Sequence, residues 1–403
     1  MSYKPSDEIL TKYADVLVNF ALGGGKGLKK GDFVYLSVSL SALPMYKAVR
    51  KAIFDRGGHV LGALNDDMSG WERYVFDHAT NEQLTFFPAH YYRGIVSDID
   101  HYMAILSDHN MHELDKVDPQ KIILAQKSRK RLTEWLDKKE DRGRLTWTLA
   151  LYGTPAMAKE AGLSLEEYWN QIIKACYLDY SDPISRWQKT STEVERIAAK
   201  LTDLNISSMH IQGQDVDLQI TIGRDRKWLG GGGRNIPSFE VFTSPDWRGT
   251  EGWIRFNQPL YNYGPKIEGI ELHFAKGRVI KATAKKHQKL LREMISADKG
   301  ASQIGEFSLT DHRHSHITKF MANTLYDENI GGRFGNTHIA VGRAFRDVYR
   351  GDVATVRKQT MRQLGFNESV VHNDMISTGD RTVTATLPDG QKKVIYKDGQ
   401  FEV

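Results

Sequence analysis

Hydrophobic and polar positions in the N-terminal half of the chain alternate between helical and strand-like patterns. Residues 8–21 carry apolar side chains at helical spacing. Short apolar runs at 33–38 and 59–64 enclose a helical pattern over 44–56, which has proline in its first turn and two glycines after its end. A strand, a helix and a strand in this order form a β-α-β unit, so we predict a parallel sheet. Further strands are predicted at residues 103–106 and 145–150.

The pattern changes to regular β alternation after about residue 209. Apolar and polar side chains alternate over residues 216–222. Two strands, 270–274 and 279–284, flank a turn that contains Gly277, which predicts a β-hairpin. Helices are predicted at residues 191–204 and 285–297, and a strand at 394–396.

This change in pattern predicts two domains. The 403 residues are enough for two domains with buried cores. A turn at residues 181–183 marks a boundary. We therefore predict an N-terminal α/β domain with a largely parallel sheet over residues 1–185. An α+β C-terminal domain over residues 186–403 carries all the candidate site residues.

Charge and segment composition exclude several classes of partner. The 55 basic and 50 acidic residues leave a net charge of +5, which is too weak over this length to favour nucleic acid. The densest basic run, Lys127 to Arg131, is typical of a solvated helix face. The sequence shows no signal peptide at its start and no stretch of about eighteen apolar residues, so we expect a cytoplasmic protein without a membrane partner. The single cysteine, Cys176, is predicted to pack inside a helix.

Six residues in the C-terminal half have side chains suited to divalent metal ions. Carboxylates bind hard divalent cations, and imidazoles favour zinc, cobalt or manganese. Two such ions close together can polarise a carbonyl group and generate hydroxide near neutral pH. The six residues are Glu240, Glu306, Glu328, His338, His372 and Asp374.

Considered alone, each of these residues has a simpler explanation. Glu240 lies among apolar neighbours, where a buried carboxylate needs a partner such as Arg234. Glu306 is unremarkable by itself, and residues 327–329 have the composition of a polar turn. A His-x-Asp segment such as 372–374 occurs often by chance, but in an extended segment its first and last side chains would lie on the same side.

Together, these segments resemble the M29 metallo-aminopeptidases, the family of thermophilic aminopeptidase T and aminopeptidase S. The order of Glu240, Ile304-Gly305-Glu306, Asp327-Glu328-Asn329, His338 and His372-Asn373-Asp374 carries the resemblance, which covers nearly the whole chain. It implies a two-domain intracellular exopeptidase that forms a homodimer. It also implies hydrolysis of the N-terminal peptide bond of short peptides with two divalent ions, zinc, cobalt or manganese.

The resemblance implies a role for each candidate residue. Glu306 would bridge the two ions. A carboxylate must carry a proton to the leaving amine, and Glu240 and Glu306 are the candidates for this catalytic role. Asp327 and Asn329 would hold the loop around the remaining glutamate. The implied metal ligands are Glu240, Glu306, Glu328, His338, His372 and Asp374.

One position departs from the family pattern. Family members carry a tyrosine seven residues after the metal-binding histidine, and the residue seven after His338 is Phe345. Phenylalanine has no oxygen to bind a metal or stabilise an oxyanion. Tyr349 would replace the missing hydroxyl if the segment is helical there; otherwise it packs against its neighbours. We include Tyr349 among the candidate catalytic residues.

Three further histidines offer an alternative metal site. His312, His314 and His316 alternate in sequence and would share one face of a strand. The family has no ligand at this position, and the flanking Thr310, Arg313 and Ser315 are predicted to face solvent. We therefore expect an exposed loop, or one on the substrate side.

Two other functions are compatible with the sequence. The first is a binuclear metal hydrolase of another amide or of an ester, because the missing tyrosine and a longer loop before His338 leave room for a different substrate. The second is a non-catalytic metal-binding relative, which Phe345 favours and the retained ligand set opposes. A substrate panel and the metal content would distinguish them.

Overall fold

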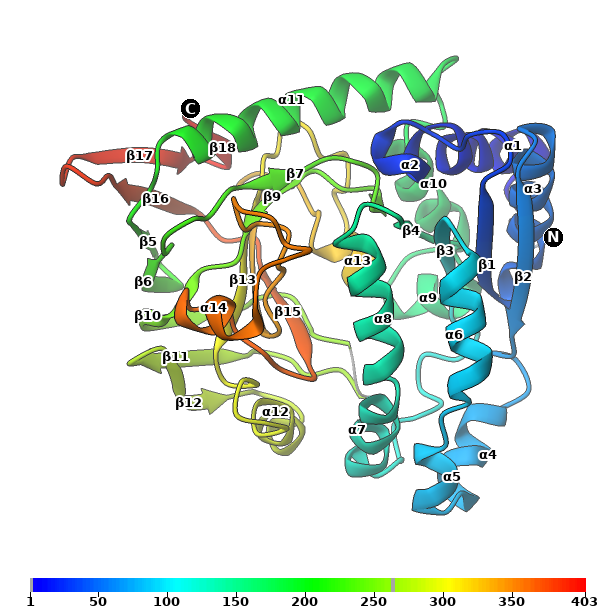
Figure 1. Ribbon diagram of the computed structural model, residues 1–403, viewed down its shortest axis with the longest axis horizontal. Coiled ribbons are helices and arrows are strands. Elements are labelled where there is room, and N and C mark those ends of the chain that lie inside the picture. The colour runs from blue at the N-terminus through cyan, green and yellow to red at the C-terminus, as the bar shows by residue number, and fades with distance from the viewer. Residues whose placement is uncertain (1–2, 262–264) are drawn as a thin grey trace. The chain divides into compact units, whose positions relative to one another are not determined.

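The computed structural model describes residues 3–261 and 265–403, which form two compact units (Figure 1). The first unit contains a parallel sheet with helices, and the second contains antiparallel sheets, so the predicted fold classes are confirmed. The domain limits 1–185 and 186–403 stay a prediction. The first unit comprises residues up to Thr192 with Gly231–Ser238 and Met321–Leu325, and the second comprises Glu193–Gly230, Phe239–Phe320 and Tyr326–Val403.

Five parallel strands form the sheet of the first unit, in the order β2-β1-β3-β4-β8. β1 pairs with β2 and β3, and β4 pairs with β3 and β8. The predicted β-α-β unit is formed by β1, helix α3 and β2, which Figure 1 shows in blue. These elements are β1 (Phe33–Ser39), α3 (Leu43–Asp55), β2 (His59–Asn65), β3 (His101–Leu106), β4 (Thr146–Leu151) and β8 (Asn235–Ile236).

Local capping explains where several helices of the first unit begin. Ser164 and Glu167 form a capping box at the start of α10, and Thr154 caps α9. The hydrophobic pattern did not predict the helices between residues 71 and 140, because few of their residues are buried. The helices are α1 (Asp7–Val16, followed by a π-helix Leu17–Ala21), α2 (Leu22–Gly25), α4 (Trp71–His78), α5 (Asn81–Thr85), α6 (Ala89–Asp98), α7 (Pro119–Ser128), α8 (Lys130–Glu140), α9 (Pro155–Glu160) and α10 (Leu165–Ala175).

The larger sheet of the second unit has eight antiparallel strands in the order β12-β11-β10-β6-β5-β16-β17-β18. It contains the predicted hairpin, formed by β11 and β12, and the alternating strand β6. The strands are β5 (Ser208–Gly213), β6 (Val216–Thr221), β10 (Asp246–Arg255), β11 (Glu271–Ala275), β12 (Arg278–Thr283), β16 (Arg381–Thr386), β17 (Lys392–Lys397) and β18 (Gln400–Phe401).

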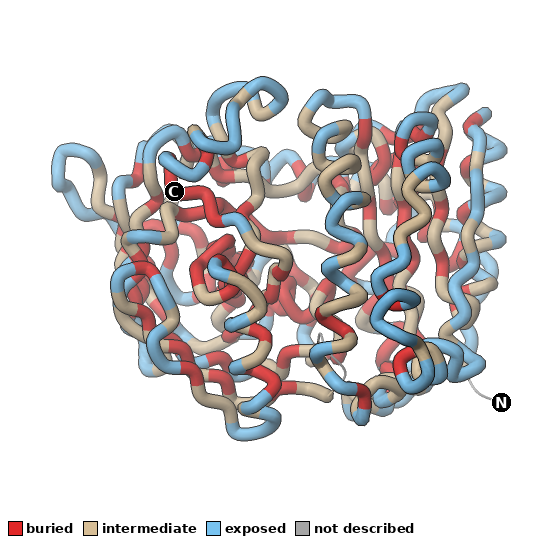
Figure 2. Tube along the Cα trace, turned by 60° about the horizontal axis from the view of Figure 1, so that its bottom comes forward, coloured by how far each residue is buried: buried red, intermediate tan, exposed pale blue. Residues whose placement is uncertain are grey.

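The smaller sheet of the second unit is antiparallel, in the order β15-β14-β13-β9-β7, and carries the candidate ligands. Every residue of β13 (Ile304–Thr310) and β14 (Asn336–Gly342) is buried. Figure 2 shows buried residues in red along strands of each unit and exposed residues in pale blue on helices and outer loops. The sequence pattern did not predict these two strands, because a strand buried on both faces has no alternation. The other strands are β7 (Leu229–Gly230), β9 (Glu240–Thr243) and β15 (His372–Ser377).

One predicted helix begins earlier than its apolar pattern indicated. Helix α11 spans Pro183–Asp203, whereas the pattern predicted a start near residue 191. Proline is favoured in the first turn of a helix, so the turn at 181–183 is also the start of α11. None of the helices in the described ranges is long and apolar enough to cross a membrane. The remaining helices are α12 (Gln288–Ile295), α13 (Thr324–Asp327) and α14 (Lys358–Gln363).

Candidate metal centre

The smaller sheet brings distant segments of the chain onto neighbouring strands. Ala340 on β14 pairs with Glu306 on β13 and with Asp374 on β15. Glu240, the first residue of β9, pairs with Thr310 at the end of β13. Antiparallel pairing therefore places side chains from β9, β13 and β15 within reach of one another.

His338 on β14 is buried and faces two carboxylates. Its Nε2 lies 3.3 Å from Glu240 Oε2 and 3.7 Å from Glu306 Oε1. Ser308 Oγ donates to the same Glu240 oxygen at 3.1 Å. Sequence reasoning missed Ser308, although it stands two residues after Glu306 and so shares its face of the strand. Recognising β13 as a strand would have found it.

The alternative partner of Glu240, Arg234, forms an ion pair elsewhere. Arg234 Nη2 lies 2.8 Å from Glu140 Oε1, and both residues belong to the first unit. Glu240 instead contacts Ser308 and His338 within the second unit. Glu240 thus lies among the candidate ligands of the second unit.

Strand β15 presents His372 and Asp374 on one face, with the buried Asn373 on the other. His372 Nε2 lies 3.1 Å from Glu306 Oε2 and 3.3 Å from Asp374 Oδ1. His372 Nδ1 donates to the backbone oxygen of Arg343 at 2.7 Å. A hydrogen bond at one ring nitrogen fixes the orientation of the imidazole, so Nε2 is directed at the carboxylates.

Glu328 follows α13 in a loop that amide side chains hold. Asn336 Nδ2 donates to the backbone oxygen of Glu328 at 2.6 Å, and Thr310 Oγ1 donates to the same oxygen at 3.3 Å. Asn329 Oδ1 accepts from the Phe239 N–H at 2.7 Å, which ties the loop to the start of β9. The predicted loop-holding role of Asn329 agrees with this contact. Asn336 carried no recognisable sequence signal.

The six side chains form three overlapping groups. Within each group the potential ligand atoms all lie within 4.8 Å of one another. Glu306, His338 and Asp374 each belong to two of the three groups. The groups are Glu240, Glu306 and His338; Glu306, His372 and Asp374; and Glu328, His338 and Asp374.

Burial and crowding shift the acid–base properties of the site. Burial raises the pKa of Glu240 to about 7; the charge of His338 opposes this shift, and the charges of Glu306 and Asp374 add to it. Burial alone would lower the pKa of His338, but the hydrogen bond to Glu306 and the neighbouring carboxylate charges raise it to about 9. Burial would raise the pKa of Glu306, but its hydrogen bonds with the two histidines lower it. The two histidines therefore carry positive charge that stabilises the ionised form of Glu306.

This donor set fits divalent cations. Four carboxylates and two imidazoles supply the oxygen and nitrogen ligands that zinc, cobalt and manganese accept. If all four carboxylates are ionised, two protonated histidines still leave an excess of negative charge. Bound divalent cations would add positive charge to this cluster of carboxylates.

Gly305 allows β13 to approach the segment after β14. A Cβ at this position would lie 2.5 Å from the backbone oxygens of Gly342 and Arg343. The Arg343 oxygen is also the one that orients His372. A side chain at position 305 would therefore displace both Glu306, the next residue, and the support of His372.

Gly305→Ala is expected to destabilise the protein by about 1–3 kcal/mol, the usual cost of overpacking, and to weaken metal binding. Urea unfolding and metal content after dialysis measure both effects. Gly94→Ala is the matched control, because a Cβ on Gly94 in α6 meets nothing within 4 Å. A Gly305→Ala protein as stable as the control would contradict this account of β13.

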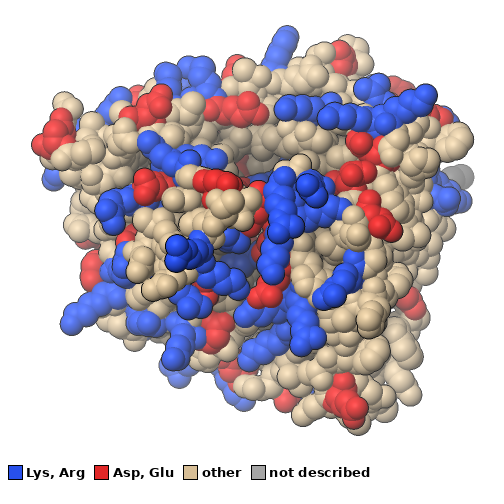
Figure 3. Space-filling model, in the orientation of Figure 1, with Lys and Arg blue, Asp and Glu red and all other residues tan. Residues whose placement is uncertain are grey.

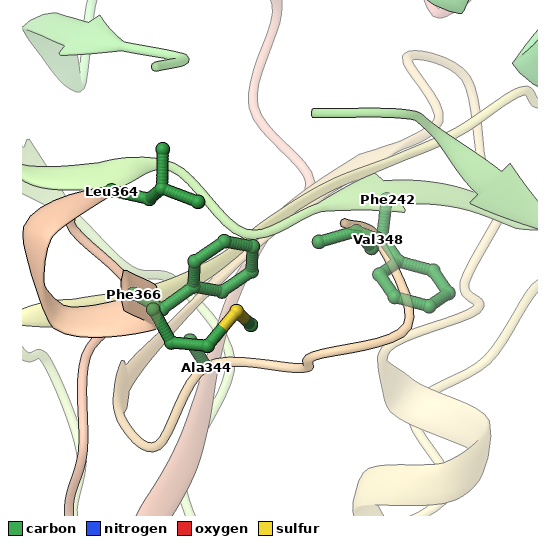
Figure 4. Packing of buried hydrophobic residues seen from close by; sticks show 6 residues of the cluster. Phe242, Ala344, Val348, Leu364 and Phe366 are labelled. Atoms are coloured by element: carbon green, nitrogen blue, oxygen red, sulfur yellow. The ribbon is translucent and has the colours of Figure 1, made fainter. Parts of the chain in front are cut away.

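Phe345, rather than Tyr349, contacts a candidate ligand. The Phe345 ring packs edge-on against His372 with a centroid distance of 4.9 Å. Residues 346–349 form a turn and an isolated bridge, not a helix. Within the described residues, Tyr349 packs against Phe366 and makes no ring or hydrogen-bond contact with the six candidate ligands. Figure 4 shows the apolar cluster beside it, made of Phe242, Ala344, Val348, Met361, Leu364 and Phe366.

The three alternating histidines lie in a loop after β13 and have other contacts. His312 Nε2 lies 3.0 Å from Gln400 Nε2, and His314 Nδ1 lies 3.4 Å from Glu193 Oε2. Across the ranges that the structure covers, none of the candidate metal groups contains His312, His314 or His316. The geometry therefore separates this cluster from the candidate centre.

Arg313 is exposed as predicted, but the predicted exposure of Thr310 and Ser315 is wrong, because both residues are buried. Their hydroxyls are satisfied inside the protein: Thr310 Oγ1 donates to the Glu328 backbone oxygen, and Ser315 Oγ donates to that of Asn329. A buried hydroxyl with a backbone acceptor avoids the cost of desolvation. Both residues therefore help to hold the loop that carries Glu328.

The chain is similar over nearly its whole length to proteins of one known family. The family described as thermophilic metalloprotease (M29) matches residues 6–401. Aminopeptidase 2 of Geobacillus stearothermophilus is 27% identical over 414 residues, covering 97% of each chain. Aminopeptidase T of Thermus thermophilus is 27% identical over 415 residues, covering 96% of this chain and 98% of that one.

A solved structure has the same fold. The structure of wild-type AmpT from Thermus thermophilus superposes with a TM-score of 0.84 at 25% identity, covering 98% of this chain and 99% of that chain. The family match spans nearly the whole sequence, and the fold is that of the matched structure. The chain therefore belongs to the M29 family of metallo-aminopeptidases, the thermophilic metalloproteases, and is a hydrolase.

Proposed function

We propose that this chain is an aminopeptidase whose six candidate ligands bind two divalent ions, zinc, cobalt or manganese. The observation that carries the proposal is the overlap of three ligand groups, formed by side chains of the smaller sheet and of the loop that carries Glu328. Glu306 is shared between two of them and is the candidate bridging ligand. The proposed ligands are Glu240, Glu306, Glu328, His338, His372 and Asp374.

The reaction proposed is hydrolysis of the N-terminal peptide bond of short peptides. Two ions held by this set would supply Lewis-acid chemistry, polarising the scissile carbonyl and activating water near neutral pH. The same ions would bind the free α-amine of the substrate. Glu240 or Glu306 carries the proton from the attacking water to the leaving amine.

Tyr349 is the third proposed catalytic residue, and a single substitution tests it. Loss of a hydroxyl that stabilises a developing oxyanion costs about a hundredfold or more in kcat. If Tyr349→Phe lowers kcat by this factor and leaves the stability of the protein unchanged, a catalytic role for Tyr349 is supported. Unchanged kcat would show that Tyr349 only packs against Phe366, consistent with its ring contact there.

The proposed assembly is a cytoplasmic homodimer, carried over from the family resemblance. Light scattering on the purified protein is expected to give a mass about twice that of the 45.8 kDa chain. A monomeric mass across the working concentration range would contradict this part of the proposal. It would leave the metal chemistry within each chain unaffected.

Metal removal tests the proposed reaction. Exhaustive chelation is expected to abolish release of N-terminal residues from di- and tripeptides, and added zinc, cobalt or manganese to restore it. Activity that survives chelation would exclude the metal mechanism. Cleavage of N-terminally blocked peptides, or faster turnover of simple esters than of peptides, would favour a different hydrolase over an aminopeptidase.

A further inference from the structure

A basic pocket lies in the first unit, separate from the candidate metal centre. It has a volume of about 340 Å³ and is lined by residues of α6, of α8 and of the turn after α8. In Figure 3, Lys and Arg side chains gather on the face where Figure 1 shows the C-terminal end of α8. The lining side chains used below are Arg93, Trp135, Lys138, Lys139, Arg142 and Arg144.

Lys139 has a structural role in this pocket. Its Nζ donates to the backbone oxygens of Val96, Ser97 and Ile99 at 2.8, 2.8 and 2.5 Å. These carbonyls end α6, where the helix would otherwise present unpaired acceptors and negative potential. Lys139 thus removes the feature of α6 that would most strongly repel an anion.

Backbone N–H groups also bind the last carbonyl oxygens of α8. The Gly143 N–H donates to the Glu140 oxygen at 2.7 Å, and the Arg144 N–H donates to the Lys139 oxygen at 3.1 Å. The carboxylate of Glu140 accepts from Trp147 Nε1 and Arg234 Nη2. The arginine side chains of the turn are therefore not needed to cap α8.

Four cations of the pocket have no hydrogen-bond or ion-pair partner for their side chains in the part of the chain that the structure covers. Arg93, Lys138, Arg142 and Arg144 donate no side-chain hydrogen bond and form no ion pair there. Cations gathered only to stabilise helix ends would bind carbonyls, as Lys139 does. Their free donors, directed around one cavity, instead produce a positive potential that attracts anions.

Trp135 forms a rigid wall of the pocket. The Arg93 guanidinium lies 5.0 Å from the centre of its indole, and the Phe87 ring lies 5.6 Å from it. Cation–π contact holds a guanidinium in place while leaving its N–H donors available. Because Arg93 and Phe87 already pack against the indole, a ligand in this pocket would be recognised by charge and hydrogen bonds rather than by stacking on Trp135.

We propose that this pocket binds the diphosphate group of a small molecule. Guanidinium groups match phosphate oxygens with paired N–H donors, and such charge-assisted bonds are stronger than neutral ones. A diphosphate carries several negative charges on two phosphate groups, so it can contact several of the four cations at once. A volume of about 340 Å³ is at the small end of ligand pockets, which suits a compact anion.

Calorimetric titration of the full chain with inorganic pyrophosphate tests the proposal, with adenosine diphosphate and citrate as parallel probes. The double substitution Arg142→Gln and Arg144→Gln is expected to weaken pyrophosphate binding at least tenfold. The control substitutes Lys127→Gln and Arg131→Gln, which removes the same charge from α7 and α8 outside the pocket lining. The control is expected to bind within about twofold of the unsubstituted protein.

The outcomes separate pocket binding from other binding. Pyrophosphate binding that both double variants weaken equally would be a general charge effect and would overturn the proposal. Pyrophosphate binding that is unchanged in the pocket variant would place the ligand elsewhere, such as at bound metal, and would also overturn the proposal. Citrate that binds as tightly as pyrophosphate would contradict the preference for phosphate. Tighter binding of adenosine diphosphate than of pyrophosphate would support a nucleotide as the source of the diphosphate, and equal binding an inorganic one.

Discussion

Glu306→Gln is expected to lower aminopeptidase activity by at least about a hundredfold, the upper range seen when the supports of a metal ligand are lost. Glutamine keeps the shape of the side chain but removes its charge. Glu306 faces both His338 and His372 and is shared by two ligand groups. One substitution therefore weakens two proposed ion sites at once.

Kinetics on a dipeptide amide, together with metal content, measure this effect. Glu82→Gln is the matched control, because Glu82 is an exposed residue of α5. The control is expected to keep its activity and its metal. If Glu306→Gln retained both ions and full activity, the bridging assignment would be wrong.

His338→Gln is expected to lower activity by a similar factor, at least about a hundredfold, and to reduce the bound metal. His338 belongs to two ligand groups, and its Nε2 faces Glu240 and Glu306. Glutamine fills much of the volume of the buried imidazole, so loss of activity need not reflect unfolding. His372→Ala is expected to have an effect of the same order.

The triple change of His312, His314 and His316 to alanine is the control for His338. These residues lie outside every candidate ligand group among the described residues, so activity should fall far less and the metal content should stay the same. Both sets of variants are reconstituted under identical conditions. If the triple variant lost its metal while His338→Gln kept both ions, the assignment of His338 as a metal ligand would be wrong.

Those parts of the fold that have a local sequence pattern were predictable. The β-α-β unit of β1, α3 and β2 has helical and strand spacing with proline and glycine at its ends. The hairpin of β11 and β12 has a turn with glycine between two alternating segments. The arrangement of His372 and Asp374 on one face of β15 follows from strand alternation alone.

The parts that depend on long-range packing were not predictable. β13 and β14 are buried throughout, so they lack the alternation that marks a strand. Thr310 and Ser315 were expected at the surface because of residue type, but backbone acceptors from the Glu328 loop allow them to be buried. The proximity of Glu240, Glu306 and Asp374 depends on the pairing order of the smaller sheet, which no local pattern specifies.

The metal content of the purified chain tests the central claim most directly. After reconstitution with zinc, cobalt or manganese and removal of free metal, elemental analysis is expected to find close to two divalent ions per chain, as a co-catalytic pair requires. The Glu306→Gln protein, treated in parallel, is expected to bind no more than about one. A chain that binds no divalent ion with any of the three metals would contradict the assignment of Glu240, Glu306, Glu328, His338, His372 and Asp374 as a dinuclear centre.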